Sequence, residues 1–303
     1  TYDLSISKKT DTGEYEVELT GVNITAWEAD NVSHGDDARE YVVVHNEIPG
    51  GLQKTIEERL EMDPTKIKNL KLTGKIANSD YNCMRDKMTG LQRLNLKEVE
   101  SFGENGRYEI PREAFRGKST LVKCIFPDRL EKIDDAAFSG TALAGTILLP
   151  EGLKYVSGFD QTKITRIEFP STLEEIGNSA FENCTSLMYQ ILLPESLRKI
   201  GEKAFSSSAI SGSLLLPHNL EIIDKGAFYK CSNLSGSLVI PDRVIEIPHS
   251  SFYGVFSRCG FNGTLTLPSG LKIIGDYAFS NVNFKGELNI PDGVEVIGSQ
   301  AFS

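Results

Sequence analysis

A fifteen-residue unit, ILLPESLRKIGEKAF at 191–205, returns with the same spacing along most of the chain. Its branched apolar residues Ile191 and Leu193 flank one variable position, Pro194 follows, and the unit closes on Ala204 and Phe205. The next copy, LLLPHNLEIIDKGAF at 214–228, keeps this order. Self-similarity at a short, nearly fixed period predicts a solenoid, in which each unit buries its apolar face against its neighbours.

The repeat also predicts how each coil is built. Proline cannot donate a backbone hydrogen bond, so a proline after the apolar-x-apolar segment should end a short parallel strand there. One phenylalanine in each unit should stack on the next as a buried ladder. These phenylalanines recur at intervals of 21 to 27 residues: Phe115, Phe138, Phe159, Phe181, Phe205, Phe228, Phe252, Phe279 and Phe302. The longest interval contains an insertion that offers two candidates for one rung, Phe252 and Phe256.

The chain before the regular repeats predicts three segments. Residues 1–50 alternate apolar and polar positions and contain a β-branched run, which indicates a β-rich segment. We favour a lead-in that packs on the array, and the alternatives are a small independent domain or the tail of one. Residues 51–109 predict a capping unit of atypical repeats. It has one amphipathic helix ending before Pro64, a strand at 69–72, a second helix from an N-cap at Ser79, and a strand at 94–96. Residues 110–303 form the regular repeats.

The unit IEFPSTLEEIGNSAFENC at 167–184 closely resembles the BspA-type leucine-rich repeat of bacterial surface proteins. The resemblance covers about residues 110–303, and residues 65–109 more loosely. It implies a leucine-rich-repeat solenoid with short parallel strands stacked one per repeat and turns or short helices on the other sides. It also implies export, surface display as an outer-membrane lipoprotein, and adhesion to host or matrix proteins. An alternative is a targeting or spacer module of a larger cell-surface enzyme.

Composition narrows the classes of partner. The chain has 42 acidic and 32 basic residues and a net charge of −10, which disfavours nucleic acid and anionic membranes. No run approaches the roughly 20 apolar residues of a membrane span. The chain begins at Thr1, so we expect membrane contact only through a lipid anchor on a removed leader.

The five cysteines have neither the paired spacing of a zinc site nor that of a disulfide framework. Cys184, Cys231 and Cys259 each lie three residues after a phenylalanine, and Ser208 holds the matching place in another unit. They predict a column of structural thiols. A bridge between Cys231 and Cys259 would join successive coils, but stacked parallel side chains point the same way, so five free thiols are expected.

No spacing of residues indicates catalysis, a cofactor or a metal. The four histidines are scattered, and the motifs HExxH, GxSxG, GxGxxG and the P-loop do not occur. Adjacent acidic residues such as Glu174 and Glu175 fall on turns, whereas acid-base chemistry needs carboxylates that face one another across a cleft. We therefore expect a non-enzymatic protein without cofactors.

One set of positions predicts a binding surface. The middle residue of each strand should face away from the core, and several of these residues are apolar. Side by side on neighbouring coils, they would form an exposed stripe that suits a protein or peptide ligand. The competing interpretation is that branched residues suit strands and shield one another. The residues of this candidate stripe are Ile125, Leu148, Leu192, Leu215 and Val239.

The last repeat predicts a second mode of association. Leu288, Ile290, Val294, Ile297 and Phe302 would lack a covering neighbour on one side. A free solenoid end with an open strand edge invites pairing with another copy, so we expect end-to-end self-association or fraying.

Overall fold

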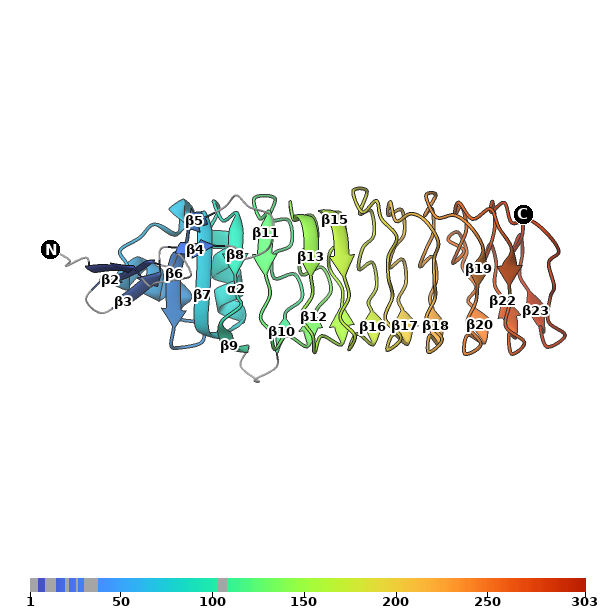
Figure 1. Ribbon diagram of the computed structural model, residues 1–303, viewed down its shortest axis with the longest axis horizontal. Helices are drawn as coiled ribbons and strands as arrows, with labels where there is room; N and C mark the ends of the chain where they lie inside the picture. Colours follow the sequence, from blue (N-terminus) through green and yellow to red (C-terminus); the bar gives the residue numbers. More distant parts are fainter. Residues whose placement is uncertain (1–4, 9–14, 20–21, 26, 30–37, 103–107) are drawn as a thin grey trace. The chain divides into compact units, whose positions relative to one another are not determined.

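The computed structural model describes residues 5–8, 15–19, 22–25, 27–29, 38–102 and 108–303. The predicted lead-in at 1–50 therefore lies partly outside the described residues. The chain divides into two compact units (Figure 1). Unit 1 comprises residues 1–109 and 118–128, and unit 2 comprises residues 110–117 and 129–303.

Unit 1 begins with antiparallel strands. Strands β1 (Ser5–Lys8), β2 (Tyr15–Leu19) and β3 (Val22–Thr25) form one sheet in that order. Strand β4 (Trp27–Ala29) pairs with β5 (Ala38–Glu40). The alternating pattern at 15–19 correctly predicts a strand, because period-two alternation places one face toward a neighbour.

A parallel sheet follows within unit 1. Its order is β11 (Lys123–Ile125), β8 (Arg93–Asn95), β7 (Asn69–Ile76) and β6 (Val42–Asn46), and β9 (Val99–Phe102) pairs with the end of β7. The strands predicted at 69–72 and 94–96 are confirmed. The parallel stack begins one strand earlier than predicted, because β6 pairs with β7 in parallel register although its segment lacks the repeat's proline.

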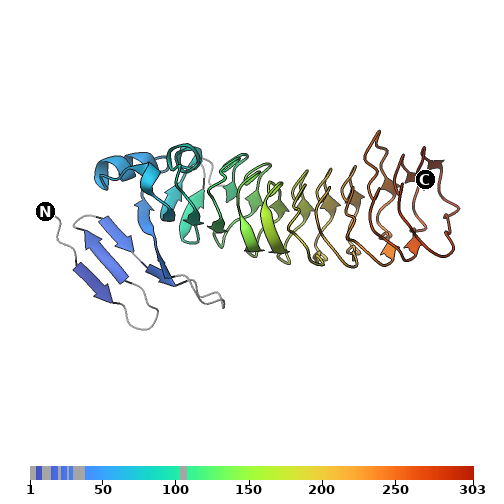
Figure 2. The same cartoon turned by 90° about the horizontal axis from the view of Figure 1, so that it is seen from above.

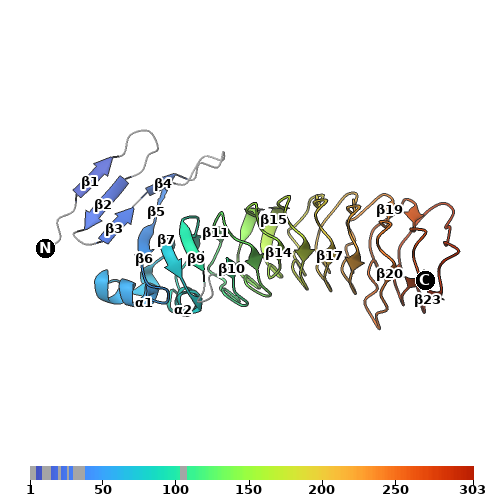
Figure 3. The same cartoon turned by 90° about the horizontal axis from the view of Figure 1, so that it is seen from below.

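Both helices predicted in unit 1 are present, and Figures 2 and 3 show them along one side of this sheet. The first consists of α1 (Leu52–Lys54) and the π-helical η1 (Thr55–Arg59), and a 3-10 turn, η2 (Pro64–Lys66), follows. The second consists of α2 (Asn78–Asn82) and the π-helical η3 (Cys83–Lys87). The predicted N-cap at Ser79 is wrong, because the helix begins one residue before it.

The carboxylate of Asp80 explains this helix start. It is buried and accepts hydrogen bonds from the amides of Ala77 (2.8 Å), Gly50 (2.7 Å) and Leu52 (2.9 Å) and from the Asn46 side chain (3.1 Å). One side chain thus satisfies donors at the starts of both helices, where backbone amides have no helical partner.

Unit 2 is a solenoid with two columns of short parallel strands (Figure 1). The regular column lies at the second apolar position of each repeat, where the sequence analysis expected turns or short helices. Its strands β12, β14, β16, β17 and β18 pair in that order, as do β20, β22 and β23. Their bounds are β10 (Glu109–Ile110), β12 (Lys132–Ile133), β14 (Tyr155–Val156), β16 (Glu175–Ile176), β17 (Lys199–Ile200), β18 (Ile222–Ile223), β20 (Glu246–Ile247), β22 (Ile273–Ile274) and β23 (Val296–Ile297).

The column predicted from the apolar-x-apolar segments is discontinuous. Strand β13 (Ala144–Leu148) pairs with β15 (Lys163–Glu168), and β19 (Leu238–Val239) pairs with β21 (Leu265–Thr266). Each of these four strands ends two residues before its proline, as predicted. The strands expected at 191–193 and 214–216 are absent, because these segments form no backbone hydrogen bonds in the described chain.

The phenylalanine ladder is confirmed with one correction. Eight successive pairs of rings stack with centroids 5.2 to 5.7 Å apart and planes tilted by 3° to 20°. The rung in the long interval is Phe256, which is fully buried between Phe228 and Phe279, whereas Phe252 is 77% exposed. The four inserted residues leave the core as a loop, as solenoid insertions generally do.

Backbone hydrogen bonds tie successive coils together around each phenylalanine. In one coil the amides of Ser179, Phe181 and Asn183 donate to carbonyls of the next coil over 2.8, 2.7 and 2.9 Å. Ser179 and Asn183 have φ of 51° and 57°, in the left-handed region. This conformation on both sides of the ring turns alternate amides toward the same neighbour. The equivalent amides repeat this pattern at the next junction.

All five cysteines are buried and free. The thiols of Cys184, Cys231 and Cys259 donate to phenylalanine carbonyls of the preceding coil over 3.1, 3.1 and 2.9 Å. Burial raises the pKa of the Cys184 thiol to about 11. These thiols therefore act as buried hydrogen-bond donors in the core, in the column that the spacing predicts.

In the last coil, the apolar residues that are buried in earlier coils are half-buried or exposed: Leu288, Ile290, Val294, Ile297 and Phe302. Their counterparts one coil earlier, such as Leu271 and Ile274, are fully buried.

The corrected register gives a direct test. Phe256→Ala should lower the free energy of unfolding by about 3 to 5 kcal/mol, because it opens a cavity between two stacked rings. Phe252→Ala should change it by less than about 0.5 kcal/mol, because that ring is exposed. Urea unfolding followed by circular dichroism measures both. Equal losses for the two variants would contradict the assigned register.

Candidate functional site

The exposed middle residues of the apolar-x-apolar segments form the candidate site. Leu192, Leu215 and Val239 are 67%, 65% and 57% exposed, and both Ile191 and Leu214 beside them are buried. Leu148 is 50% exposed at the end of β13. The alternation of buried and exposed residues is therefore as predicted for these positions.

The fifth candidate, Ile125, is not part of this group. It lies in β11 of unit 1 and is half-buried. Leu148 is separated from the others by Glu168, which lies opposite it in the β13–β15 register. We therefore define the apolar stripe as Leu192, Leu215 and Val239.

Polar residues mark the limits of the apolar stripe. On one side Glu168 forms an ion pair with Arg166 (3.1 Å), and on the other side Val239 lies opposite Thr266. The exposed residues Gln190, Ser213 and Ser237 precede the three segments. An apolar centre with a polar, mostly uncharged rim is the usual anatomy of a protein-binding surface.

Tyr189 explains why the strand column is interrupted beside Leu192. Its hydroxyl group accepts a hydrogen bond from the Ile167 amide (3.2 Å) and donates one to the Ile167 carbonyl. The side chain thus binds the backbone groups at the edge of β15 with which the next strand would otherwise pair. The segment 191–193 is left with an open backbone next to an exposed leucine.

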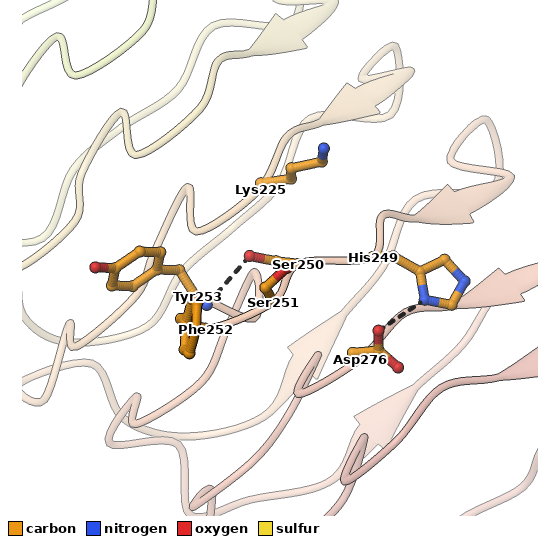
Figure 4. Close-up of a pocket in the computed structure, with 7 residues that line it drawn as sticks. All are labelled: Lys225, His249, Ser250, Ser251, Phe252, Tyr253 and Asp276. Atoms are coloured by element: carbon orange, nitrogen blue, oxygen red, sulfur yellow. Dashed lines mark hydrogen bonds and ion pairs between the residues drawn. The ribbon is translucent and has the colours of Figure 1, made fainter.

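A hollow lies at the insertion loop that precedes Phe256. It has a volume of about 260 Å³ and is lined by His249, Ser250, Tyr253, Asp276 and three further residues (Figure 4). The His249 imidazole lies 3.3 Å from the Asp276 carboxylate. Serine, histidine and aspartate together raise the question of a hydrolytic triad.

Ser250 does not complete a triad with His249 and Asp276. The Ser250 hydroxyl accepts a hydrogen bond from the Tyr253 amide (3.1 Å), and Figure 4 shows it directed away from the imidazole. A nucleophile must lie within hydrogen-bond reach of its base. The Asp276 carboxylate instead has a structural role, because it binds both the His249 imidazole and the Ser299 amide (2.6 Å) and so connects the loop to the next coil.

The remaining polar residues singled out from the sequence have structural contacts. Glu175 forms an ion pair with Lys199 (2.8 Å), and Asp135 accepts a hydrogen bond from the Tyr155 hydroxyl (2.8 Å). Burial, together with that bond, raises the pKa of Tyr155. Among the described residues, no three His, Cys, Asp or Glu side chains group as metal ligands, and no helix is long and apolar enough to cross a membrane.

Comparison with known protein families decides the classification. The model of the BspA-type leucine-rich repeat region matches residues 47–156, 108–234, 155–258 and 253–303, in six copies. The chain belongs to the BspA-type leucine-rich repeat family. Comparison with curated proteins gives no match.

The comparison with solved structures matches several leucine-rich repeat proteins. A leucine-rich repeat protein from T. pallidum is 24% identical over 62% of this chain and 75% of its own, with a TM-score of 0.43. One from Bacteroides ovatus is 16% identical over 97% and 89%, with a TM-score of 0.47. A leucine-rich cell-surface protein from Faecalibacterium prausnitzii is 16% identical over 93% and 96%, with a TM-score of 0.28.

The BspA-type motif alone does not reveal that Met188 is exposed or that the Tyr189 side chain binds the backbone of the preceding coil. Met188 is exposed beside Tyr189, where other repeats have small residues such as Ser235 and Gly236. The substitution of bulky residues for small ones is a visible signal in the sequence. Its consequence, a side chain bound to the backbone of the preceding coil, depends on three-dimensional distances that the motif does not contain.

Proposed function

We propose that this chain is a non-enzymatic, surface-displayed or secreted scaffold that binds a protein or peptide through the apolar stripe, as in adhesion to host or matrix proteins. The observation that carries the proposal is the exposure of Leu192, Leu215 and Val239 on segments whose neighbouring strand pairing is interrupted. Membership in the BspA-type family supports a location outside the cell, because the resemblance to that family implies export and surface display.

The physical argument is that exposed branched side chains on neighbouring coils gain free energy when a partner removes them from water. Burying each such side chain contributes roughly 1.5 to 3 kcal/mol. The hydroxyl and amide groups of Ser213, Ser237 and Gln190 at the rim would remain hydrated or bind partner backbone groups. These contacts suit a protein or peptide better than an ionic ligand.

A targeting or spacer module of a larger surface enzyme is the alternative. It uses the same scaffold and differs in what is encoded next to it. The sequence of the complete gene distinguishes the two, because a fused catalytic domain would favour the alternative and a lipoprotein leader alone would favour the adhesin.

The double variant Leu192→Glu with Leu215→Glu tests the apolar stripe. It should weaken binding to an immobilised panel of laminin, collagen and fibronectin by about tenfold or more, because it places two charges in a surface that must become dry. The circular dichroism melt should remain nearly unchanged, because both side chains are exposed.

A matched control is available on the other strand column. Ile222→Glu with Ile245→Glu changes the same charge at two exposed branched residues and should leave matrix binding unchanged. Equal losses in both double variants would show that charge, and not the apolar stripe, controls binding. Loss of the fold in the first variant would show that its leucines belong to the core.

End-to-end self-association is a separate part of the proposal and involves the last coil. Within residues 1–303, Ile297 is exposed, whereas the equivalent Ile274 is buried. Sedimentation velocity of residues 1–303 over a wide concentration range should detect the association, and Ile297→Lys should prevent it. Ile245→Lys serves as the control. A monomer at every concentration would remove this part of the proposal.

A further inference from the structure

Cationic and aromatic side chains gather on the turns that carry the phenylalanine ladder. They come from three successive coils, those of Phe205, Phe228 and Phe256. We name this group the aromatic–basic patch and define it as Lys203, Tyr229, Lys230, Phe252, Tyr253 and Arg258. It lies on the turns next to the ladder phenylalanine of each coil, whereas the apolar stripe lies on the apolar-x-apolar segments.

Ring contacts connect the patch into one surface. The Lys203 Nζ atom lies 4.7 Å from the centroid of the Tyr253 ring, and Tyr253 meets Tyr229 edge-on with centroids 5.0 Å apart. Lys230 and Arg258 lie 5.2 and 6.0 Å from the Tyr229 centroid. Phe252 extends the aromatic part beyond Tyr253, at 6.4 Å. Cations at these distances are attracted to ring faces and retain their charge.

The coil between Lys203 and Tyr253 is shaped to let them meet. Its residue at this place is Gly226, with φ of +62°. A Cβ atom there would lie 3.1 Å from the Tyr253 Cβ and 3.5 Å from the Lys203 Cγ. The absence of a side chain thus lets residues that lie two coils apart pack across the middle coil.

The charge of the patch is opposite to that of the chain. The chain carries a net charge of −10, yet Lys203, Lys230 and Arg258 form no ion pair with a carboxylate among the residues that the structure describes. Lys230 and Arg258 also have φ of 59°. Gly117 and Gly140 hold this place in two earlier coils, where they adopt the same conformation without the steric cost of a Cβ atom.

Hydrogen-bonding groups flank the patch. Lys230 and Arg258 line an open hollow of about 390 Å³ together with the small polar residues Thr185, Ser207 and Asn233. Lys225 lines the hollow of Figure 4 together with Phe252 and Tyr253. Asp276, the carboxylate in that hollow, is already engaged by His249.

We infer that the aromatic–basic patch binds an acidic polysaccharide, one that carries sulfate or uronic-acid groups. The exposed rings of Phe252 and Tyr253 can pack against the apolar C–H faces of sugar rings, and the unpaired cations attract sulfate or carboxylate groups. Hydroxyl and amide side chains in the flanking hollow supply partners for sugar hydroxyl groups. This site is independent of the apolar stripe and goes beyond the proposed protein binding.

The test measures binding of residues 1–303 to heparin, to polygalacturonate and to neutral dextran by isothermal titration calorimetry. Heparin and polygalacturonate separate the sulfated from the carboxylated source. The wild-type chain should bind at least one of them and should not bind dextran. Lys230→Glu with Arg258→Glu should weaken that binding by tenfold or more. Lys272→Glu with Arg243→Glu, which makes the same change in charge on other turns, should change it less than twofold.

The exposed Phe252 separates sugar recognition from charge attraction alone. Phe252→Ala should weaken polysaccharide binding several-fold with an unchanged melting curve, because this ring is outside the core. Polyglutamate, an acidic polymer without sugar rings, should bind far more weakly than the preferred polysaccharide. Failure to bind either acidic polysaccharide, equal binding of polyglutamate, or equal losses in the two charge-reversal variants would overturn the inference.

Discussion

The hydrogen bonds around each phenylalanine hold the solenoid together, and the rest of unit 2 depends on them. The amide of a ladder phenylalanine and the amide two residues after it donate to the next coil, as at Phe205, whose own amide lies 2.8 Å from the Ala227 carbonyl. The stacked rings exclude water from these bonds, which strengthens them. Ladder and backbone therefore stabilise the same side of every coil, and the spacing between coils is fixed there.

This arrangement leaves the opposite segments free to vary. Since coils are already joined around the phenylalanines, the segments at 191–193 and 214–216 need not pair with one another. Leu192 and Leu215 stay exposed beside an open backbone, and Tyr189 takes over the edge of β15. Variation on the turns works in the same way, because the inserted loop before Phe256 carries Phe252 and Tyr253 outward without disturbing the ladder. One rigid scaffold thus presents two chemically different surfaces, as repeat proteins commonly do.

Much of this fold follows from the sequence because its repeated residues are those that determine packing. The phenylalanine and proline spacings predict the ladder and the strand ends, and the alternation around Leu215 predicts which residues are exposed. The phenylalanine intervals alone did not separate Phe252 from Phe256, although Cys259, three residues after Phe256 as Cys231 is after Phe228, was a signal in the sequence that favoured Phe256. The second strand column was missed because a two-residue strand is too short to show the alternation of apolar and polar residues that marks a strand.

Contacts between distant residues account for the other omissions. The role of Asp80 depends on donors around Gly50 that are close in space but remote in sequence. The aromatic–basic patch joins Lys203 and Tyr253 across Gly226, a contact that becomes visible only when coils are stacked. A repeat motif specifies which residues face inward, whereas the surface chemistry depends on which non-repeated residues the stacking brings together.

Hydrogen exchange of individual amides, measured by NMR on the monomer, tests the central claim most directly. If the backbone hydrogen bonds around the phenylalanines join the coils, the amides of Phe181, Phe205 and Phe228 should exchange only when the solenoid opens. The amides of Leu192 and Leu215 should exchange orders of magnitude faster, because they have no backbone partner among the described residues. Equal protection of Leu192, Leu215 and the three phenylalanines would contradict the account and would show that the coils are also joined across the apolar stripe.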